Sequence, residues 1–490
     1  MTQRISWLAL VASLATGATA PAQEPPLDTV AMKAHTRFLS HDLLRGRATG
    51  SEGARLAALY IESQCRAMRL APVGASYGQP VALEESRVLP ETRLLASRGQ
   101  SVAEFRYPAD FTPNVGTRTT LRDFGGRAVF VGSEETIVSP ALDGVALDGR
   151  VAVTLGPIRG APADTLARRG ATGMIHLVGD PDAYQLYVRS RGDTRLYHAG
   201  PEVQSSFFPP LPAVLAGPRL SRMLLRYATV GPADDIPPQA LGWSLEATIA
   251  LERRSVESHN VVCLLPGRDA AARDTAVVFM AHYDHLGVGV PSAAGDSIYN
   301  GFSDNAAGVA MLLAIARRLE EQPLRHSTLF LFPTGEERGL LGSDHFVAHP
   351  PWPLERIAAV INLDAGAPAA PPVRWQLAGV DGTGLGALAG AVAAERGWEI
   401  TTSAPRPNSD YFPFTRRGVP GLLIIPGPLP YEGLSAESSS ALFRRWDHYH
   451  QPDDEWAEDF PYAGLARYAE FAYLIGKRVD AAPPSRVPSR

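Results

Sequence analysis

Short apolar runs alternate with amphipathic helical segments along the C-terminal half of the chain, and this alternation constrains the fold more than any other feature. Buried strands are predicted for the apolar runs at residues 277–281, 328–332, 357–363 and 422–425. Helices are predicted where apolar residues recur at helical spacing, at residues 306–320, 339–348, 384–396 and 462–478. Strands that alternate with helices favour a parallel sheet. We therefore expect an α/β fold whose mixed, mostly parallel sheet is covered by helices on both faces.

The segment before this region is organised differently. Residues 30–70 have apolar residues at helical spacing, whereas residues from about 100 to 250 form short apolar runs broken by glycine and proline. The second texture is typical of a small β-rich domain with some helix. We expect one main domain, formed by residues 23–99 and 251–480, that is interrupted by an inserted smaller β-rich α/β domain at residues 100–250. Residues 481–490 contain three prolines and are expected to be a disordered tail.

The N-terminus has the three parts of an export signal. Arg4 provides a positive charge, residues 5–18 form an apolar run, and Ala-Pro-Ala at residues 20–22 resembles a cleavage site. This run is shorter than the roughly 20 residues that cross a membrane, and no later stretch could span one. We expect residues 1–22 to be a signal peptide and the mature protein to be exported, periplasmic or secreted, without a membrane anchor. A buried N-terminal helix is the alternative.

The chain has two cysteines, too few for a disulfide scaffold. Cys65 lies on a helical pattern and Cys263 lies inside an apolar run, so both are interpreted as buried small hydrophobic residues. A single bridge between them remains open. Because the sequence has no CxxC and no third cysteine, a thiolate metal site is excluded.

Charge and lysine content exclude several function classes. The net charge is −5, and the arginines are dispersed among acidic residues, so no nucleic-acid partner is expected. Lys33 and Lys477 are the chain's lysines and lie near its ends. No lysine is therefore placed for a P-loop or a Schiff base. The sequence does not indicate an oligomeric state.

Side chains that can bind a metal follow the predicted strands or precede a predicted helix. They are His282, Asp284, Asp304, Glu336, Glu337, Asp364 and His450. Ligands of open parallel sheets bind at the carboxyl ends of the strands, so we expect these side chains to converge at one edge. Imidazoles and carboxylates together bind borderline or hard divalent cations, zinc first among them.

Each of these residues has an ordinary structural interpretation. Glu336 and Glu337 could be acids at a helix N-terminus, and Asp304 could be an N-cap. His282 and His285, each taken alone, could be surface or core histidines, and the aspartates of the loop after the last strand, Asp447, Asp453 and Asp454, are interpreted as solvated. Residues that can bind a metal stand at the ends of several strands and before a helix, and this coincidence favours a metal site.

Two metals bridged by one carboxylate would form the centre of a hydrolase. Such metals share a water molecule, lower its pKa and polarise the scissile carbonyl. A further free carboxylate must take the proton of that water and pass it to the leaving amine. Adjacent glutamates can divide this work, because successive side chains in a loop point in different directions.

Five segments, in this order, resemble the motifs of metallopeptidase family 28, the co-catalytic zinc aminopeptidases and their glutamate carboxypeptidase relatives. They are residues 281–287 (AHYDHLG), 303–308 (SDNAAG), 336–343 (EERGLLGS), 362–364 (NLD) and 449–452 (YHQP). The resemblance implies that the metal ligands are His282, Asp304, Glu337, Asp364 and His450, with Asp304 bridging. It also implies that Glu336 is the general base and that Asp284 orients the His282 ring.

The same resemblance implies the activity. It predicts a metallo-exopeptidase that acts on peptide substrates with two Zn²⁺ per chain, which cobalt or manganese can replace. An aminopeptidase is expected first, and a carboxypeptidase or dipeptidase on the same site is the alternative. A non-catalytic receptor-like binding protein and a glutaminyl-cyclase-like transferase are further alternatives, which the full ligand set disfavours. The interval 100–250 resembles the protease-associated domain that some members carry.

Overall fold

The computed structural model describes residues 27–114, 122–158, 160–191, 194–200, 211–225 and 236–482. The predicted signal peptide, residues 1–22, lies outside the described residues. So do residues 483–490 of the predicted tail, whose first residue, Ala481, ends the last helix. None of the helices in the described ranges has the length and apolar character needed to cross a membrane.

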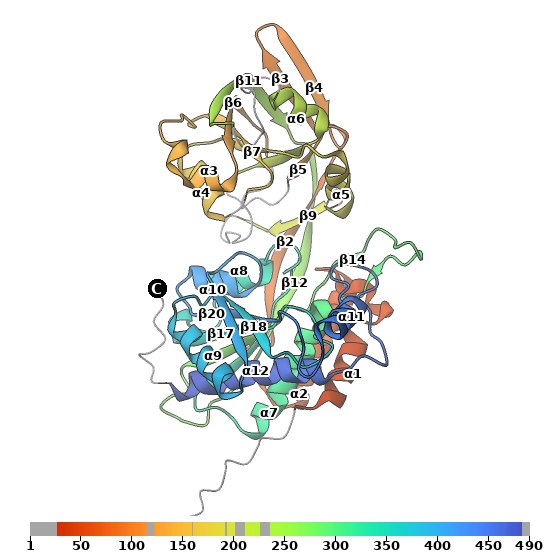
Figure 1. The fold of residues 1–490 in the computed structure, drawn as a ribbon, viewed down its shortest axis with the longest axis vertical. Helices are drawn as coiled ribbons and strands as arrows, with labels where there is room; N and C mark the ends of the chain where they lie inside the picture. Colours follow the sequence, from red (N-terminus) through yellow and green to blue (C-terminus); the bar gives the residue numbers. More distant parts are fainter. Residues whose placement is uncertain are drawn as a thin grey trace, which may run out of the picture.

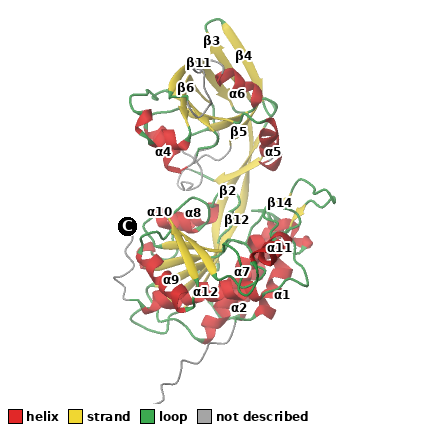
Figure 2. Cartoon of the chain, in the orientation of Figure 1, coloured by secondary structure: helices red, strands yellow, loops and turns green. Residues whose placement is uncertain are grey.

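A ten-stranded mixed sheet forms the centre of the main domain (Figures 1 and 2). Its strand order is β19-β18-β20-β17-β13-β16-β12-β2-β9, and β1 pairs with β12. The strands are β1 (Ala71–Pro72), β2 (Gly78–Val88), β9 (Thr194–His198), β12 (Leu251–Leu265), β13 (Ala276–Met280), β16 (Ser327–Phe332), β17 (Ile357–Asn362), β18 (Arg374–Ala378), β19 (Glu399–Ser403) and β20 (Gly421–Pro426). The four strands predicted from the apolar runs correspond to β13, β16, β17 and β20.

Parallel pairing joins β16, β13, β17 and β20 at the centre of the sheet, and also β18 with β19. The mixed α/β fold is confirmed, but the sheet is not mostly parallel over its full width. The strands β12, β2 and β9 pair antiparallel beside β16. The physical reason is the path of the chain: β2 leaves the main domain and β12 returns to it, so the two strands run in opposite directions.

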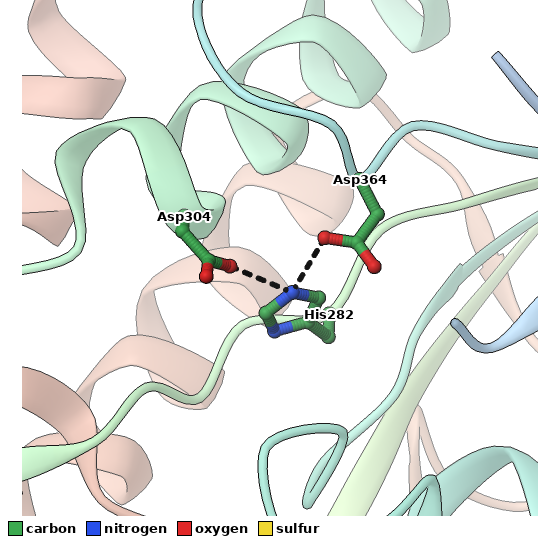
Figure 3. A group of neighbouring side chains, drawn as sticks. All are labelled: His282, Asp304 and Asp364. Carbon is green, nitrogen blue, oxygen red and sulfur yellow. Dashed lines mark hydrogen bonds and ion pairs between the residues drawn. The ribbon is translucent and has the colours of Figure 1, made fainter. Parts of the chain in front are cut away.

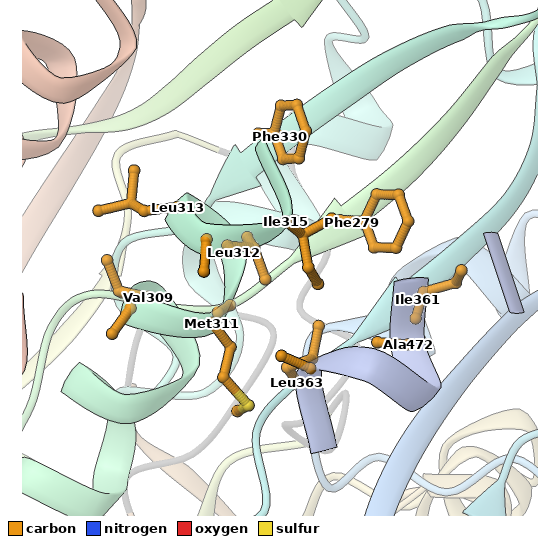
Figure 4. Close-up of a cluster of buried hydrophobic side chains, with 14 of the residues drawn as sticks. Phe279, Val309, Met311, Leu312, Leu313, Ile315, Phe330, Ile361, Leu363 and Ala472 are labelled. Carbon is orange, nitrogen blue, oxygen red and sulfur yellow. The ribbon is translucent and has the colours of Figure 1, made fainter. Parts of the chain in front are cut away.

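Helices cover both faces of this sheet. One face is covered by α1 (Thr29–Leu39), α2 (Glu52–Ala67), α7 (Ala307–Glu321), α9 (Gly384–Glu395) and α12 (Ala463–Ala481). The other face is covered by α8 (Leu341–Ala348) and α10 (Tyr411–Arg416). Alternate residues of β13 therefore enter different cores. Phe279 packs with α7 and α12 (Figure 4), whereas Val278 belongs to the cluster on the opposite face. This double covering explains why the central strands are continuous apolar runs.

An eight-stranded sheet forms a second unit, which β2 and β12 join to the first (Figure 1). Its order is β4-β3-β11-β6-β7-β8-β10-β5. The strands are β3 (Arg93–Arg98), β4 (Ser101–Arg106), β5 (Phe111–Asn114), β6 (Phe124–Gly132), β7 (Arg150–Leu155), β8 (Gly173–Leu177), β10 (Ala213–Ala216) and β11 (Gln239–Thr248). The helices between these strands are α3 (Glu134–Val138), α4 (Gly160–Arg168), α5 (Pro181–Arg191) and α6 (Pro218–Leu225).

The second unit starts earlier in the chain than the insertion predicted at residues 100–250, because β3 begins at Arg93. One strand of the same interval, β9, leaves this unit and pairs with β2 at the edge of the ten-stranded sheet. The strand β9 therefore connects the two units in addition to β2 and β12.

A disulfide links Cys65 in α2 to Cys263 in β12, and both residues are buried. The disulfide that the sequence neither predicted nor excluded is thus present. It joins residues separated by 198 positions, and so ties the N-terminal helices to the strand that returns from the second unit.

Candidate metal centre

The predicted ligands lie at the carboxyl ends of the central parallel strands. β13 ends at Met280, two residues before His282, and β17 ends at Asn362, two residues before Asp364. Asp304 lies in the single turn Phe302–Ala306 that leads into α7. These positions bring the side chains to one edge of the sheet, as expected for an open α/β fold.

The first group of ligands consists of His282, Asp304 and Asp364 (Figure 3). The Nε2 atom of His282 is 2.9 Å from Oδ1 of Asp364 and 3.1 Å from Oδ1 of Asp304. One ligand atom of each residue lies within 4.8 Å of the others, which is close enough for a shared ion. Three predicted ligands are therefore brought together.

The second group consists of His285, Asp304 and Glu337, with His450 beside it. His285 Nδ1 is 2.7 Å from Oε1 of Glu337. His450 Nε2 is 3.1 Å from Oδ2 of Asp304 and 3.2 Å from Oε2 of Glu337. Asp304 thus offers one carboxylate oxygen to each group, which is the geometry of a bridging ligand.

His285 is the residue of this group to which the sequence assigned no role. It was interpreted as an ordinary surface or core histidine, yet it is fully buried against Glu337. The available signal was the second histidine of the segment His282-Tyr-Asp-His285, in the loop that follows β13. A histidine pair with this spacing in a strand-end loop can supply ligands to both groups.

The donor set fits divalent cations. Imidazole nitrogens and carboxylate oxygens are zinc ligands, and the ligand atoms of each group converge. The Nδ1 atom of His285 faces the carboxylates of both Glu337 and Asp304, at 2.7 and 3.9 Å, so this nitrogen is placed to serve as a ligand atom.

The ordinary interpretations of the acids fail for local reasons. The side chain of Asp304 caps no helix, since the turn has no side-chain cap and α7 has Ala306 at its N-cap position. Glu336 and Glu337 lie outside the first turn of α8, because that helix begins at Leu341. Their carboxylates are therefore free for the site.

Asp284 lies behind His282 and is itself held from two sides. Thr49 Oγ1 donates to its Oδ2 at 2.8 Å, and the backbone N–H of Glu336 donates to its Oδ1 at 3.2 Å. The Nδ1 atom of His282 is 3.8 Å from the Asp284 carboxylate and 3.2 Å from the backbone oxygen of the same residue. In this structure the carbonyl is the nearer partner that can orient the ring, and Asp284 links the loops of His282 and Glu336.

Asp454 is buried against the turn that carries Asp304, so the expectation of a solvated Asp454 is wrong. Its carboxylate accepts the backbone N–H groups of Ser303 at 2.8 Å and of Asp304 at 3.2 Å. Only 1% of the residue is exposed, and this burial raises its pKa to about 6. The loop interpretation failed because the contact joins segments about 150 residues apart in sequence.

Arg47 is a buried cation that holds two of the metal-bearing loops. Its guanidinium donates to the backbone oxygens of Tyr283 at 2.8 Å and Asn300 at 2.6 Å, and also contacts that of Gly301. Burial lowers its pKa to about 10, which leaves it charged at neutral pH. This fixed positive charge offsets part of the mutual repulsion among the neighbouring carboxylates, which are those of Asp284, Asp304, Glu337 and Asp454.

Hydrogen bonds also hold Asp364. Ser409 Oγ donates to its Oδ2, and Asn305 Nδ2 donates to its Oδ1 at 3.3 Å. Ser409 belongs to a buried Ser-Asp pair, and the neighbouring Asp410 accepts Ser343 Oγ at 2.5 Å. Hydrogen-bonded outer partners of this kind fix the orientation of a metal ligand.

Glu336 differs from its neighbour Glu337 in its surroundings. Burial, and next the negative charge of Asp364, raise the pKa of Glu336 well above its usual value. Burial also acts on Glu337, but His285 and His450 outweigh it and lower the pKa of Glu337 to about 2. The adjacent glutamates are thus an ionised ligand and a carboxylate that readily accepts a proton.

Fold and site together define an α/β protein with two convergent groups of metal-binding side chains, and a sequence comparison identifies the family of its C-terminal part. The Peptidase family M28 model matches residues 260–475, a segment that contains all the ligands named above. Residues 260–475 of the chain therefore form a domain of peptidase family M28.

The chain is similar to several curated proteins over parts of their length. It is 36% identical to the vacuolar membrane protease of Candida dubliniensis over 110 residues, which is 22% of this chain and 10% of that protein. It is 26% identical to the probable leucine aminopeptidase 2 of Aspergillus oryzae over 215 residues, 41% of this chain and 39% of that protein. The chain thus matches about a tenth of the first relative's length and less than half of the second's.

A solved structure shares the fold over nearly the whole chain. The aminopeptidase from Aneurinibacillus sp. strain AM-1 has a TM-score of 0.56 at 20% identity, over 95% of this chain and 96% of that one. This likeness concerns the fold alone. The protease-associated type of that unit stays a prediction.

Proposed function

We propose that this protein is an exported exopeptidase that holds two zinc ions and removes N-terminal residues from peptides. The observation that carries the proposal is the shared carboxylate of Asp304, which offers one oxygen to each ligand group. Two groups that share a ligand support a pair of neighbouring cations. His282 and Asp364 would hold one ion, and Glu337 and His450 the other, with His285 as an additional ligand or close partner.

When bound, such cations polarise a scissile carbonyl and lower the pKa of the attacking water. The protein groups then manage the proton. The Glu336 carboxylate has no hydrogen bond or ion pair among the described residues, and its raised pKa suits a group that must both take and return a proton. It would accept the proton of the water and deliver it to the departing amine.

A pocket next to the site supports the choice of an aminopeptidase. It has a volume of about 360 Å³ and is lined by residues adjacent to two ligands, Ser303 and Ala365, and by apolar side chains that include Leu429, Phe443 and Trp446. Asp447 is the charged residue of its described lining. An apolar pocket with one carboxylate suits the side chain and free ammonium group of an apolar N-terminal residue.

A second pocket favours the alternative, a carboxypeptidase or dipeptidase. Its volume is about 310 Å³, and three arginines, Arg195, Arg254 and Arg338, line it together with Glu85. Arg254 pairs with Glu85 at 2.5 Å, and three arginines against one glutamate give the lining a positive formal charge. Thr49, which contacts Asp284, also lines this pocket. A basic pocket near the site would suit a substrate carboxylate.

Export is supported by the chemistry of the cysteines. A buried disulfide such as Cys65–Cys263 forms and persists in oxidising compartments. The apolar N-terminal run supplies the expected signal.

A panel of short peptides with apolar first residues tests the proposal. Each peptide is supplied free, N-acetylated and C-amidated, and bound zinc is measured on the same preparation. We expect acetylation to abolish cleavage, amidation to preserve it, and two zinc ions to be found per active chain. Cleavage that requires the free carboxylate and tolerates acetylation would replace the aminopeptidase by the alternative.

A further inference from the structure

Three histidines gather away from the metal centre, where β9 meets the end of α8. His198 is the last residue of β9, His345 lies in the last turn of α8, and His349 follows one turn later. The ring centroids of His198 and His345 are 6.3 Å apart, and those of His345 and His349 are 4.7 Å apart. Figure 1 shows β9 at the junction of the two units, with α8 below it.

A small hydrophobic cluster holds the two elements together at this place. Leu341, one turn before His345, packs with Val81, Leu83 and Leu196. His198 pairs with Leu83 in the ladder between β9 and β2. Residues four apart on a helix lie on the same face, so the contact of Leu341 directs His345 toward β9. The histidines thus extend a packed contact and are not scattered surface residues.

The His198 ring is left without hydrogen bonds. Both of its ring nitrogens are buried and have no partner among the described residues. Buried polar atoms are almost always satisfied, so these two nitrogens are available to a water, a ligand or an ion. Because desolvation lowers the pKa of both His198 and His345, their rings are neutral and keep a lone pair for coordination.

The C-terminal end of α8 adds an electrostatic field that favours a cation at this place. The C-terminus of a helix carries a partial negative charge, which stabilises a nearby cation. His345 in the last turn and His349 at the C-cap position bring two imidazoles to this end, with ring centroids 4.7 Å apart. His349 is the exposed member of the trio.

We propose that His198, His345 and His349 bind a divalent first-row transition-metal ion at the junction of the two units, separate from the catalytic centre. The all-nitrogen donor set selects Zn²⁺, Cu²⁺ or Ni²⁺ over Mg²⁺ or Ca²⁺. The ligand atoms of this trio are not as closely gathered as those of the two catalytic groups. Binding of an ion would therefore require the His349 ring to turn toward the other two. Binding would tie β9, a strand that lies in the chain between strands of the second unit, to α8, the helix that follows Glu336 and Glu337.

Calorimetric titration of the zinc-loaded enzyme with Ni²⁺ tests this site. The wild-type protein should bind one equivalent of Ni²⁺ more than the His198→Ala variant and the His345→Gln variant. The same equivalent should remain in His41→Asn, a matched control at an exposed histidine in which the asparagine keeps a cap acceptor. With Cu²⁺, nitrogen hyperfine structure in the electron paramagnetic resonance spectrum should be present in the wild type and lost in His345→Gln.

Peptidase activity and melting temperature without added metal serve as the check on folding. Both should match the wild type in His345→Gln, whose side chain is only half-buried. An equal Ni²⁺ stoichiometry in the wild type and in His345→Gln would overturn the proposal, as would a loss of the equivalent in His41→Asn. A His198→Ala variant that fails to fold leaves the His345→Gln result to decide.

Discussion

The two ligand groups of the metal centre share Asp304 but are built in different ways. The first group takes His282 and Asp364 from the ends of adjacent central strands, and hydrogen bonds from Ser409 and Asn305 fix Asp364. The second takes His450 from the loop before α12, where the backbone has a positive φ of 56° and the side chain is 34% exposed. The ends of strands are more rigid than a strained loop. We therefore expect the proposed ion of the second group to be held more weakly than that of the first.

Tyr449 stacks on His450, and this contact is a second difference between the two ligand groups. The two rings lie 3.8 Å apart, and Tyr449 is 64% exposed. The second group is therefore completed by a segment that faces solvent. Rigidity in one group and access at the other would suit the proposed two-zinc peptidase.

The largest effect should come from the residue that belongs to both groups. In the Asp304→Ala variant we expect both zinc ions to be lost and activity to fall below detection, because the first group keeps only two protein ligands and the second loses the carboxylate that joins it to the first. Metal analysis together with a peptide-cleavage assay measures this. Retention of one tightly bound ion would show that the groups are independent and that Asp304 does not bridge.

Glu336 belongs to neither group, so its removal should separate chemistry from metal binding. We expect Glu336→Gln to keep both ions and to lower kcat by about 10²- to 10⁴-fold, the usual size of a general-base contribution. Zinc content and kcat are measured on the same sample. Near-normal turnover would remove Glu336 from the role of base.

His285 tests whether the second group has three or four protein ligands. The His285→Ala variant should lose affinity for one ion only, and the remaining ion should resist a chelator as it does in the wild type. Stepwise removal of zinc by a chelator, with activity followed at each step, measures the difference. In the wild type the more weakly held ion should leave first. Simultaneous release of both ions would contradict the unequal construction.

Asp454 should give the smallest effect, because it acts through the backbone of the Asp304 turn. Asp454→Asn keeps an acceptor but removes the charge that receives the N–H groups of Ser303 and Asp304. We expect a loss of about 10-fold in zinc affinity, at the low end for outer partners of a metal ligand. Serine in place of the exposed Asp453 is the matched control. Equal zinc affinities in both variants would restore the solvated-loop interpretation.

Much of the main domain could be predicted from local patterns. The central strands are buried on both faces, so their apolar runs are continuous, and α7, α9 and α12 begin within one residue of their predicted starts. The flanking strands escaped this reasoning. Their pairing depends on the path of β2 and β12 into and out of the second unit, and nothing in a short window of sequence encodes that path.

The sequence by itself determined which residue types stand at the ends of the strands and in what order, and this order was enough to indicate the family and its ligands. Tertiary structure alone decided which atoms meet. It shows Asp304 between two groups, His285 against Glu337, Asp454 beneath the Asp304 turn and Cys65 joined to Cys263. The physical reason is distance along the chain: spacing in sequence reports contacts within one helix or strand, whereas these contacts join separate elements that only the folded core brings together.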